Sequence, residues 1–188
     1  GPNDLSLDPN GGFYFTDLGK RYARQRDHGG IYYAKPDGSM IKCLVHPFLS
    51  PNGCGLSPDG RTLYVADTES ARLWAFDIEG PGMLRKPTGN AHHSGRVVGA
   101  VGSNARFDSL AVLENGNIAV AYNVSASTSV YPGLRYVGRL ATDTLGTMTQ
   151  GEATIVAGSA ANGSNRWGDY AHLSVDPADD CTFWSTGQ

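Results

Sequence analysis

Three residues with oxygen-bearing side chains, Asn3, Asn52 and Asp108, occur at the same position of a repeated sequence module. Two amide oxygens and one carboxylate are hard ligands that suit Ca²⁺, Mg²⁺ or Mn²⁺ and that Zn²⁺ tolerates. The alternative is that each side chain only caps its own turn, as Asn and Asp commonly do. We favour a shared site, because three such residues at one register form a constellation rather than a single coincidence.

The module that positions these residues reads as strand, tight turn and strand. Its clearest copy, Pro51 to Asp67, contains Ser-Pro-Asp-Gly, which is typical of a β-turn because Pro presets φ and Gly accepts positive φ. The other copies begin at Asn3, Asp108 and, more weakly, Ala171, so the spacings are 49, 56 and 63 residues. Repeats of roughly 40 to 50 residues with several short strands are typical of propeller blades.

The sequence therefore predicts an all-β chain, a β-propeller with about four blades, forming a single domain over residues 1–188. No segment has the 3.6-residue period of an amphipathic helix. Equivalent positions of the blades converge on the central channel of a propeller. We accordingly expect Asn3, Asn52 and Asp108 to become neighbours around that channel.

Composition limits the classes of partner. The 188 residues carry a net charge of −3 with a pI near 5.9, which argues against nucleic acid or an anionic membrane surface as the main partner. No apolar run approaches the roughly 20 residues that span a bilayer. Cytoplasmic, periplasmic and secreted locations all remain open.

The strings PNDLSLD, GGFYFTD, GGIYYAKPDG, PNGCGLSPDGRTLYVADT, ARLWAFDI and RFDSLAV resemble the gluconolactonase branch of the SMP-30/gluconolactonase/luciferin-regenerating family. The resemblance covers residues 1–124. It implies a six-bladed propeller that holds one divalent metal in its channel and hydrolyses a lactone or a related ester.

The resemblance also implies roles for individual residues. Asn52 and Asp108 match metal ligands, Asp108 matches the general base, and Asn3 matches an asparagine that contacts the substrate or the water on the metal. Calcium is the first expectation for the metal, with Zn²⁺, Mg²⁺ or Mn²⁺ as alternatives. The metal would polarise the ring carbonyl and acidify a water whose proton Asp108 accepts. Asp4 and Ser109 are either supporting partners of this site or caps of their own turns.

Two departures from the family pattern limit these expectations. The remaining metal ligand of the family is a glutamate in an N-terminal blade, and the sequence begins at the Asn3 motif without it. Six blades at the observed spacings would need about 300 residues.

A four-blade chain leaves sheet edges open, so we expect a homodimer or a compact closure. The functional alternative to a lactonase or esterase is a non-catalytic propeller fragment that serves as a binding or structural module.

Residues 125–188 form a divergent C-terminal region. The segment Asn165 to Trp184 resembles a repeat of bacterial proteins with sialidase-like propellers, a resemblance that implies no catalytic role. Its acidic residues either bind a cation or form a solvated turn, and we favour the turn; they are Asp169, Asp176, Asp179 and Asp180.

Several residues with reactive side chains are assigned to ordinary structural roles. We expect His92 and His93 to be exposed on a Gly-rich loop, and His172 to be a packed or edge histidine on a strand. The three cysteines lack metal-type spacing and are interpreted as small, mostly buried hydrophobic residues; they are Cys43, Cys54 and Cys181. The sequon that begins at Asn123 is attributed to chance.

Overall fold

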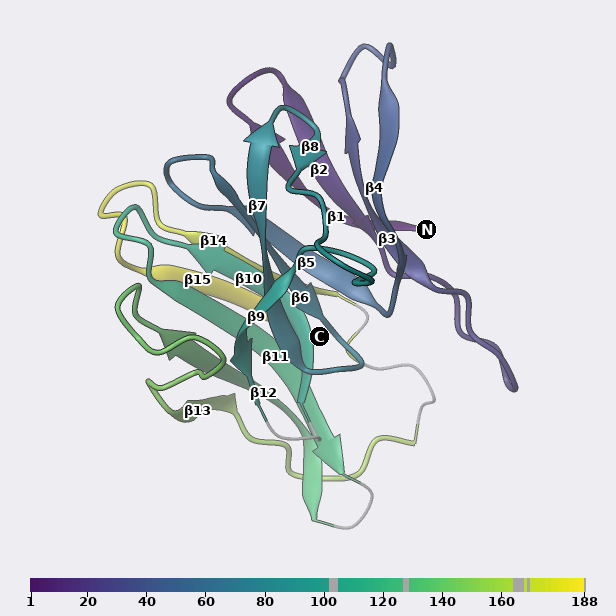
Figure 1. Ribbon diagram of the computed structural model, residues 1–188. Coiled ribbons are helices and arrows are strands. Elements are labelled where there is room, and N and C mark those ends of the chain that lie inside the picture. Colours follow the sequence, from purple (N-terminus) through teal and green to yellow (C-terminus); the bar gives the residue numbers. More distant parts are fainter. Residues whose placement is uncertain (102–104, 127–128, 164–167, 169, 188) are drawn as a thin grey trace.

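The computed structural model describes residues 1–101, 105–126, 129–163, 168 and 170–187, and only the backbone of residues 105 and 106. Its described residues form fifteen strands in successive antiparallel sheets, with no helix among them. No described segment is therefore a helix that could cross a bilayer. Figure 1 shows the sheets fanning out one after another along the chain, as blades of a propeller do.

The first two sheets contain the first half of the chain. The first sheet has the order β1 (Pro2–Asp8), β2 (Gly12–Asp17), β3 (Gly29–Ala34), β4 (Ile41–Phe48). The second has the order β5 (Pro51–Leu56), β6 (Thr62–Asp67), β7 (Arg72–Gly80), β8 (Met83–Leu84), and β9 (Arg96–Ala100) also pairs with β7. Each begins at a repeat predicted from the sequence.

The remaining two sheets contain the second half. The third sheet has the order β10 (Ala105–Val112), β11 (Ile118–Ala126), β12 (Val130–Arg139), β13 (Glu152–Val156). The fourth is a single hairpin of β14 (Ala171–Val175) and β15 (Phe183–Gly187). The all-β, blade-by-blade prediction is confirmed, with three full sheets and one two-stranded sheet in the described residues.

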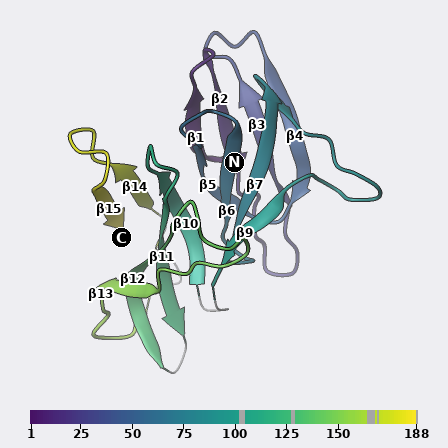
Figure 2. The same cartoon turned by 60° about the vertical axis from the view of Figure 1, so that its left-hand side comes forward.

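The innermost strands of the four sheets, β1, β5, β10 and β14, lie next to one another in that order. Figure 2 shows this order of strands from another side, with β14 and β15 beside β10 and the first sheet at the opposite end. The first strand of every repeat thus faces the same central region, which is the arrangement that brings equivalent positions together.

Apolar side chains fill the spaces between consecutive sheets. Tyr14, Ile31 and Tyr33 of the first sheet pack against Leu63, Val65 and Phe76 of the second. A second cluster joins the second and third sheets through Leu73, Phe107 and Val120 among others. The last interface is smaller, because only Leu173 of the hairpin is buried, against three alanines of the third sheet.

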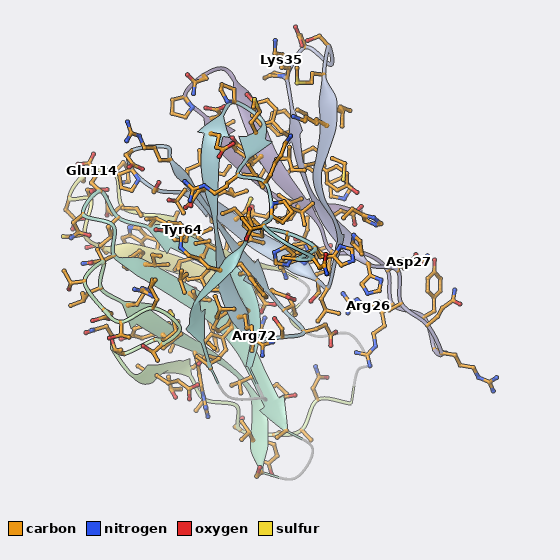
Figure 3. The ribbon with its side chains drawn as sticks, in the orientation of Figure 1. Arg26, Asp27, Lys35, Tyr64, Arg72 and Glu114 are labelled. Carbon is orange, nitrogen blue, oxygen red and sulfur yellow. The ribbon has the colours of Figure 1, made fainter. Side chains whose placement is uncertain are left out.

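The loop between Leu18 and Gly29 connects β2 to β3, and Figure 3 labels Arg26 and Asp27 on it. Arg26 fastens this loop, since its guanidinium donates to the carbonyl oxygens of Leu18 and Leu49, at 3.0 and 3.1 Å. It also lies 3.0 Å from the Glu69 carboxylate.

Candidate functional site

Asn3, Asn52 and Asp108 line one cavity, which has a volume of about 540 Å³. Each of the three comes from the innermost strand of a different sheet, namely β1, β5 and β10. The fourth innermost strand, β14, contributes Ala171 and His172. The repeat alignment placed Asn3, Asn52, Asp108 and Ala171 at one register, and the structure gathers these four residues around one hollow.

A smaller cavity of about 200 Å³ shares five lining residues with the larger one. The shared residues are Asn3, Asn52, Asp108, Ala171 and His172. Because these five line both hollows, they form a ring between them. Any small molecule or ion held by this ring would be accessible from the larger cavity.

A β-bulge sets the position of each of the three predicted site residues. Pro2 pairs with Asp17 and Leu5 with Phe15, so Asn3 and Asp4 together face one residue of β2. The same extra residue occurs on β5, and on β10 it is Asp108 itself. Bulges re-aim side chains and are over-represented beside active sites. Three sheets therefore interrupt their ladders at the same point, where the ring lies.

The innermost strands approach so closely at this point that one position has no room for a side chain. A Cβ on Gly53 would lie 2.7 Å from Cα of Ser109 and 2.9 Å from the carbonyl oxygen of Asp108. The hydroxyl of Thr16 also bridges two sheets, because it donates to the carbonyl oxygen of Asn52 at 2.5 Å. Glycine here allows β5 to lie directly against β10.

The side chain of Asn52 is oriented by a hydrogen-bond chain through Thr68. The Thr68 hydroxyl donates to the carbonyl oxygen of Phe107 at 2.7 Å, so it accepts from Nδ2 of Asn52 at 3.0 Å. That bond commits the amide nitrogen and leaves Oδ1 of Asn52 as the atom available for a ligand. No described residue donates a hydrogen bond to this oxygen.

The carboxylate of Asp108 is held by Asn123, a residue that the sequence analysis did not connect with the site. Both the backbone N–H and Nδ2 of Asn123 donate to Oδ2 of Asp108, at 3.1 and 2.8 Å. Asn123 is buried, which does not suit an exposed glycosylation acceptor. Asn123 lies within β11, at the repeat position that Thr68 occupies directly after β6, and this parallel was the available signal.

Below the ring, Asp4 joins the first two sheets, since its Oδ2 accepts a hydrogen bond from the backbone N–H of Cys54 at 2.8 Å. Burial first, and the charge of Asp4 second, raise the pKa of the Cys54 thiol well above its usual value. Cys54 is therefore a neutral thiol at physiological pH and no nucleophile. Ser109 lines the smaller cavity, and its buried Oγ has no partner among the described residues.

The C-terminal hairpin contributes side chains that sequence reasoning did not assign to the site. His172 and Thr186, paired on β14 and β15, both line the larger cavity together with Tyr170. His172 lies on β14, an edge strand of the two-stranded sheet, so the edge alternative of the prediction is confirmed; its side chain is exposed and lines the cavity. Its distance of 64 residues from Asp108 in the sequence gave no local signal of this proximity.

Some predictions about residues outside the ring need correction. His93 is half-buried, with its ring centroid 5.1 Å from that of Phe48 and 5.0 Å from that of Trp74. Burial first, and the charge of His92 second, lower its pKa, whereas His92 is exposed as expected. Of the three cysteines only Cys54 is buried, because Cys43 and Cys181 lie on outward positions of their strand and turn.

The acidic residues of the C-terminal turn make hydrogen bonds within the hairpin or to a neighbouring turn. Asp179 accepts from the backbone N–H of Cys181 and Thr182, and Asp176 accepts from Nε1 of Trp184. Asp180 accepts from the backbone N–H of Glu114. Asp169 lies outside the described residues. In the described ranges no three His, Cys, Asp or Glu residues gather closely enough to hold a metal, so a cation at the ring would depend on amide oxygens.

The comparison with protein families concerns the part of the chain that builds most of the ring. Residues 1–133 match the family described as the SMP-30/Gluconolactonase/LRE-like region. The chain belongs to the SMP-30/gluconolactonase/LRE-like family. The matched residues contain β1, β5 and β10, and therefore Asn3, Asn52 and Asp108, whereas β14 and β15 lie beyond the match.

Curated members of the family resemble part of the chain. A protein named lactonase drp35 from Staphylococcus epidermidis is 36% identical over 87 residues, which are 46% of this chain and 26% of that protein. The lactonase drp35 of Staphylococcus aureus is 34% identical over a segment of the same length. The match thus spans about a quarter of these curated relatives.

Solved structures share the fold over almost the whole chain. A gluconolactonase from Xanthomonas campestris superposes with a TM-score of 0.62 at 23% identity, covering 99% of this chain and 54% of that one. A calcium-binding protein, regucalcin, from Agrobacterium tumefaciens gives a TM-score of 0.61 at 20% identity, covering 95% and 50%. The chain spans about half the length of these propeller relatives.

Proposed function

We propose that the ring of Asn3, Asn52 and Asp108 is the lactone-opening site of a metal-dependent hydrolase. The observation that carries the proposal is the convergence of three bulged strands on one cavity, in a member of a lactonase family. Asn52 and Asp108 would hold one divalent cation, with Asn3 beside them. With oxygen donors alone, this set suits Ca²⁺, which is our first expectation, and Mg²⁺ or Mn²⁺ better than Zn²⁺.

The donor atoms of this chain suit such a cation. The hydrogen bond from Nδ2 of Asn52 to Thr68 leaves the amide oxygen for the cation, and the two donations from Asn123 fix the plane of the Asp108 carboxylate. The unpartnered Oγ of Ser109 can bind a water in the smaller cavity. When bound, the cation would polarise the lactone carbonyl and acidify water.

The protein residues would carry the proton transfer and the positioning. Asp108 is the general base that accepts a proton from the attacking water. Asn3 is exposed at the rim and would hydrogen-bond hydroxyl groups of the substrate. A cavity of about 540 Å³ lies within the range of roughly 300 to 1,000 Å³ typical of small-molecule sites, so a single-ring sugar lactone fits.

The decisive test is the isosteric substitution Asp108→Asn, measured by pH-stat hydrolysis across a panel of aldonolactones with and without EDTA. We expect EDTA to abolish turnover, and the substitution to lower kcat by about 10² to 10⁴, the usual contribution of a general base. Asp37→Asn, on an exposed hairpin turn, is the matched control and should keep full activity. Turnover that survives both EDTA and Asp108→Asn would contradict the proposal.

The rival function is a binding or structural module that has kept the ring without the activity. It is favoured by one observation, namely that in the described ranges no three His, Cys, Asp or Glu residues lie close enough together to hold a metal. In this case the protein would bind an aldonic acid or its lactone, as measured by calorimetry, without hydrolysing it. An anomalous-scattering map without a metal at the ring would support the same alternative.

For assembly, we infer a homodimer, in which a second copy covers the outer face of the first sheet. Cross-strand pairing makes that face apolar in two rows; they are Leu5, Phe15, Tyr32, Cys43 and Leu7, Phe13, Ala34, Ile41. Leu7 and Ile41 are each 72% exposed. Contiguous exposed apolar patches are rare on monomeric proteins and commonly mark an interface.

Sedimentation equilibrium tests this dimer. We expect the wild-type chain to sediment as a dimer and the double variant Leu7→Glu, Ile41→Lys to sediment as a monomer with an unchanged circular dichroism spectrum. A monomeric wild-type chain over the whole accessible concentration range would contradict the dimer. The double variant Lys35→Glu, Ser39→Lys, on the adjacent exposed hairpin turn, is the control.

A further inference from the structure

The third sheet carries a buried side-chain amide that contacts two different parts of the chain. Asn123 lies on β11 and is only 6% exposed. Its Nδ2 donates to Oδ2 of Asp108 at 2.8 Å and to the carbonyl oxygen of Gly168 at 3.4 Å. A side-chain amide nitrogen has two hydrogens, so it can serve both acceptors at once. One side chain therefore joins the Asp108 carboxylate to the chain just before β14.

Gly168 approaches Asn123 so closely that a larger residue has no room there. A Cβ on Gly168 would lie 2.7 Å from Nδ2 and 2.9 Å from Cγ of Asn123. Its φ of +72° is in the left-handed region, which glycine adopts without a steric penalty. Gly168 also lines the larger cavity, and it lies beyond residues 1–133, which match the family. The wall of the cavity is thus in direct contact with the amide that holds Asp108.

The preceding sheet contains the same arrangement with a different side chain. Thr68 and Asn123 occupy equivalent positions, because each follows the residue that pairs with the neighbour preceding the ring residue of its own sheet. Thr68 bonds the Asn52 amide of its own sheet and the carbonyl oxygen of Phe107 in the next sheet. Asn123 does the same for Asp108 and the segment before β14. The link from a ring residue to the next segment is therefore a repeated feature of the fold.

We propose that Asn123 is the positioning residue of the general base, and that Gly168 keeps it in place, so that the segment before β14 fixes the Asp108 carboxylate. This proposal rests on the proposed function, since it takes Asp108 to be the base. Asn123 lines neither cavity of the ring, so it acts through Asp108 and not on the substrate. Positioning matters because a displacement of about 1 Å in a reacting group can lower a rate by roughly 10²-fold.

The substitution Asn123→Leu tests the positioning role, because leucine has a similar volume and no side-chain N–H. We expect kcat for lactone hydrolysis to fall by about 10- to 100-fold, with KM changed by less than about threefold, since the residues that line the cavities are untouched. The affinity of the metal-free chain for Ca²⁺, measured by calorimetry, should fall by about tenfold, as it does when a metal ligand loses its supporting hydrogen bond.

Arg139→Met is the matched control for the loss of a buried side chain that links two segments. Arg139 is 4% exposed, and its guanidinium donates to the carbonyl oxygens of Val98 in the second sheet and of Asp143. It lines neither cavity of the ring. This variant should lose thermal stability but keep its kcat and Ca²⁺ affinity, measured below the unfolding midpoint of every variant. Equal losses of kcat in Arg139→Met and Asn123→Leu would give Asn123 a structural role only and overturn the proposal.

The substitution Gly168→Ala tests the second part of the proposal without changing Asn123. The added methyl group must displace the Asn123 amide, so we expect kcat to fall by about tenfold. Gly146→Ala is the matched control, because alanine is also strained at its φ of +90° but its Cβ would meet no atom within 4 Å. An unchanged kcat in Gly168→Ala would contradict the dependence of Asp108 on the segment before β14.

The outcomes distinguish this inference from the proposed function. If Asp108→Asn removes turnover while Asn123→Leu leaves kcat and Ca²⁺ affinity unchanged, the proposed function stands and the positioning role fails. If the wild-type chain neither hydrolyses lactones nor binds Ca²⁺, the proposed function itself fails, and the inference fails with it.

Discussion

The first three sheets and the C-terminal hairpin meet at the same ring in two different ways. β1, β5 and β10 each insert one extra residue there, whereas β14 pairs with β15 in unbroken register. The bulged strands present asparagine or aspartate to the ring, and the regular strand presents Ala171 and His172. One fold position can therefore carry two local geometries.

The two regions also differ in how firmly they are attached. The first three sheets share two large apolar interfaces, supplemented by hydrogen bonds from Thr16 and Thr68 that cross from sheet to sheet. The hairpin is attached through Leu173, a few partly buried residues and the hydrogen bond from the backbone N–H of Glu114 to Asp180. We infer that the oxygen donors lie on a stiff frame, and that His172 lies on an element of lower local stability.

The largest effect on stability is expected from Gly53→Ala, because this substitution adds a side chain where the bulged strands β5 and β10 approach each other most closely. The new methyl group would lie 2.7 Å from Cα of Ser109, so β5 and β10 must separate. We expect the free energy of unfolding to fall by about 1 to 3 kcal/mol, as overpacking does, and lactone turnover to fall with it. Chemical denaturation measures the first effect.

The control for this substitution is Gly163→Ala, because a Cβ on Gly163 would meet no atom within 4 Å. It should change the free energy of unfolding by less than about 0.5 kcal/mol. If both variants had the same free energy of unfolding, the close approach of β5 and β10 would not contribute to the stability of the fold.

A smaller effect is expected from Thr68→Val, which removes the hydroxyl that orients Asn52 but keeps the side-chain shape. Without it, Nδ2 of Asn52 loses its acceptor, and the amide is free to rotate. We expect metal affinity to fall by about tenfold, in line with the loss of other supporting hydrogen bonds at metal sites. Thr186→Val alters the same cavity from the regular hairpin and should have little effect. A similar loss in both variants would remove the distinction between the two regions.

The smallest effect is the change of stability with pH. The first sheet should lose stability at alkaline pH, and the C-terminal turn should lose it at acid pH. Burial first, and the hydrogen bond to Asp8 second, raise the pKa of Tyr33 in the first sheet to about 12. Because the folded pKa exceeds the unfolded value of about 10, the stability that Tyr33 contributes is complete below pH 10 and is lost as the pH rises toward 12. Tyr33→Phe should flatten this alkaline decline in the thermal midpoint.

The C-terminal turn should respond to acid instead. Hydrogen bonds from the Thr182 hydroxyl, and then from backbone N–H groups, lower the pKa of Asp179 far below its usual value. Its contribution is present above the unfolded pKa of about 3.9 and is lost as the pH falls below it. Hydrogen exchange that is faster in β14 and β15 at low pH would show this; uniform acceleration over the whole chain would speak against it.

The sequence by itself determined the repeat, its register and the family. Asn3, Asn52 and Asp108 could be aligned because each stands at a fixed offset from a turn that local residues specify, as Pro-Asp-Gly does after Asn52. Strand alternation and turn chemistry act over a few residues, so the strand–turn–strand modules that contain the four inner strands could be predicted.

Only the tertiary structure decided which other residues meet at the ring. Asn123 reaches Asp108 from 15 positions away, Thr68 links Asn52 to Phe107, and His172 arrives from a hairpin 64 positions beyond Asp108. These contacts depend on bulges, which shift register by one residue, and on how sheets stack. Both are set by packing between distant strands, which no local pattern of residues encodes.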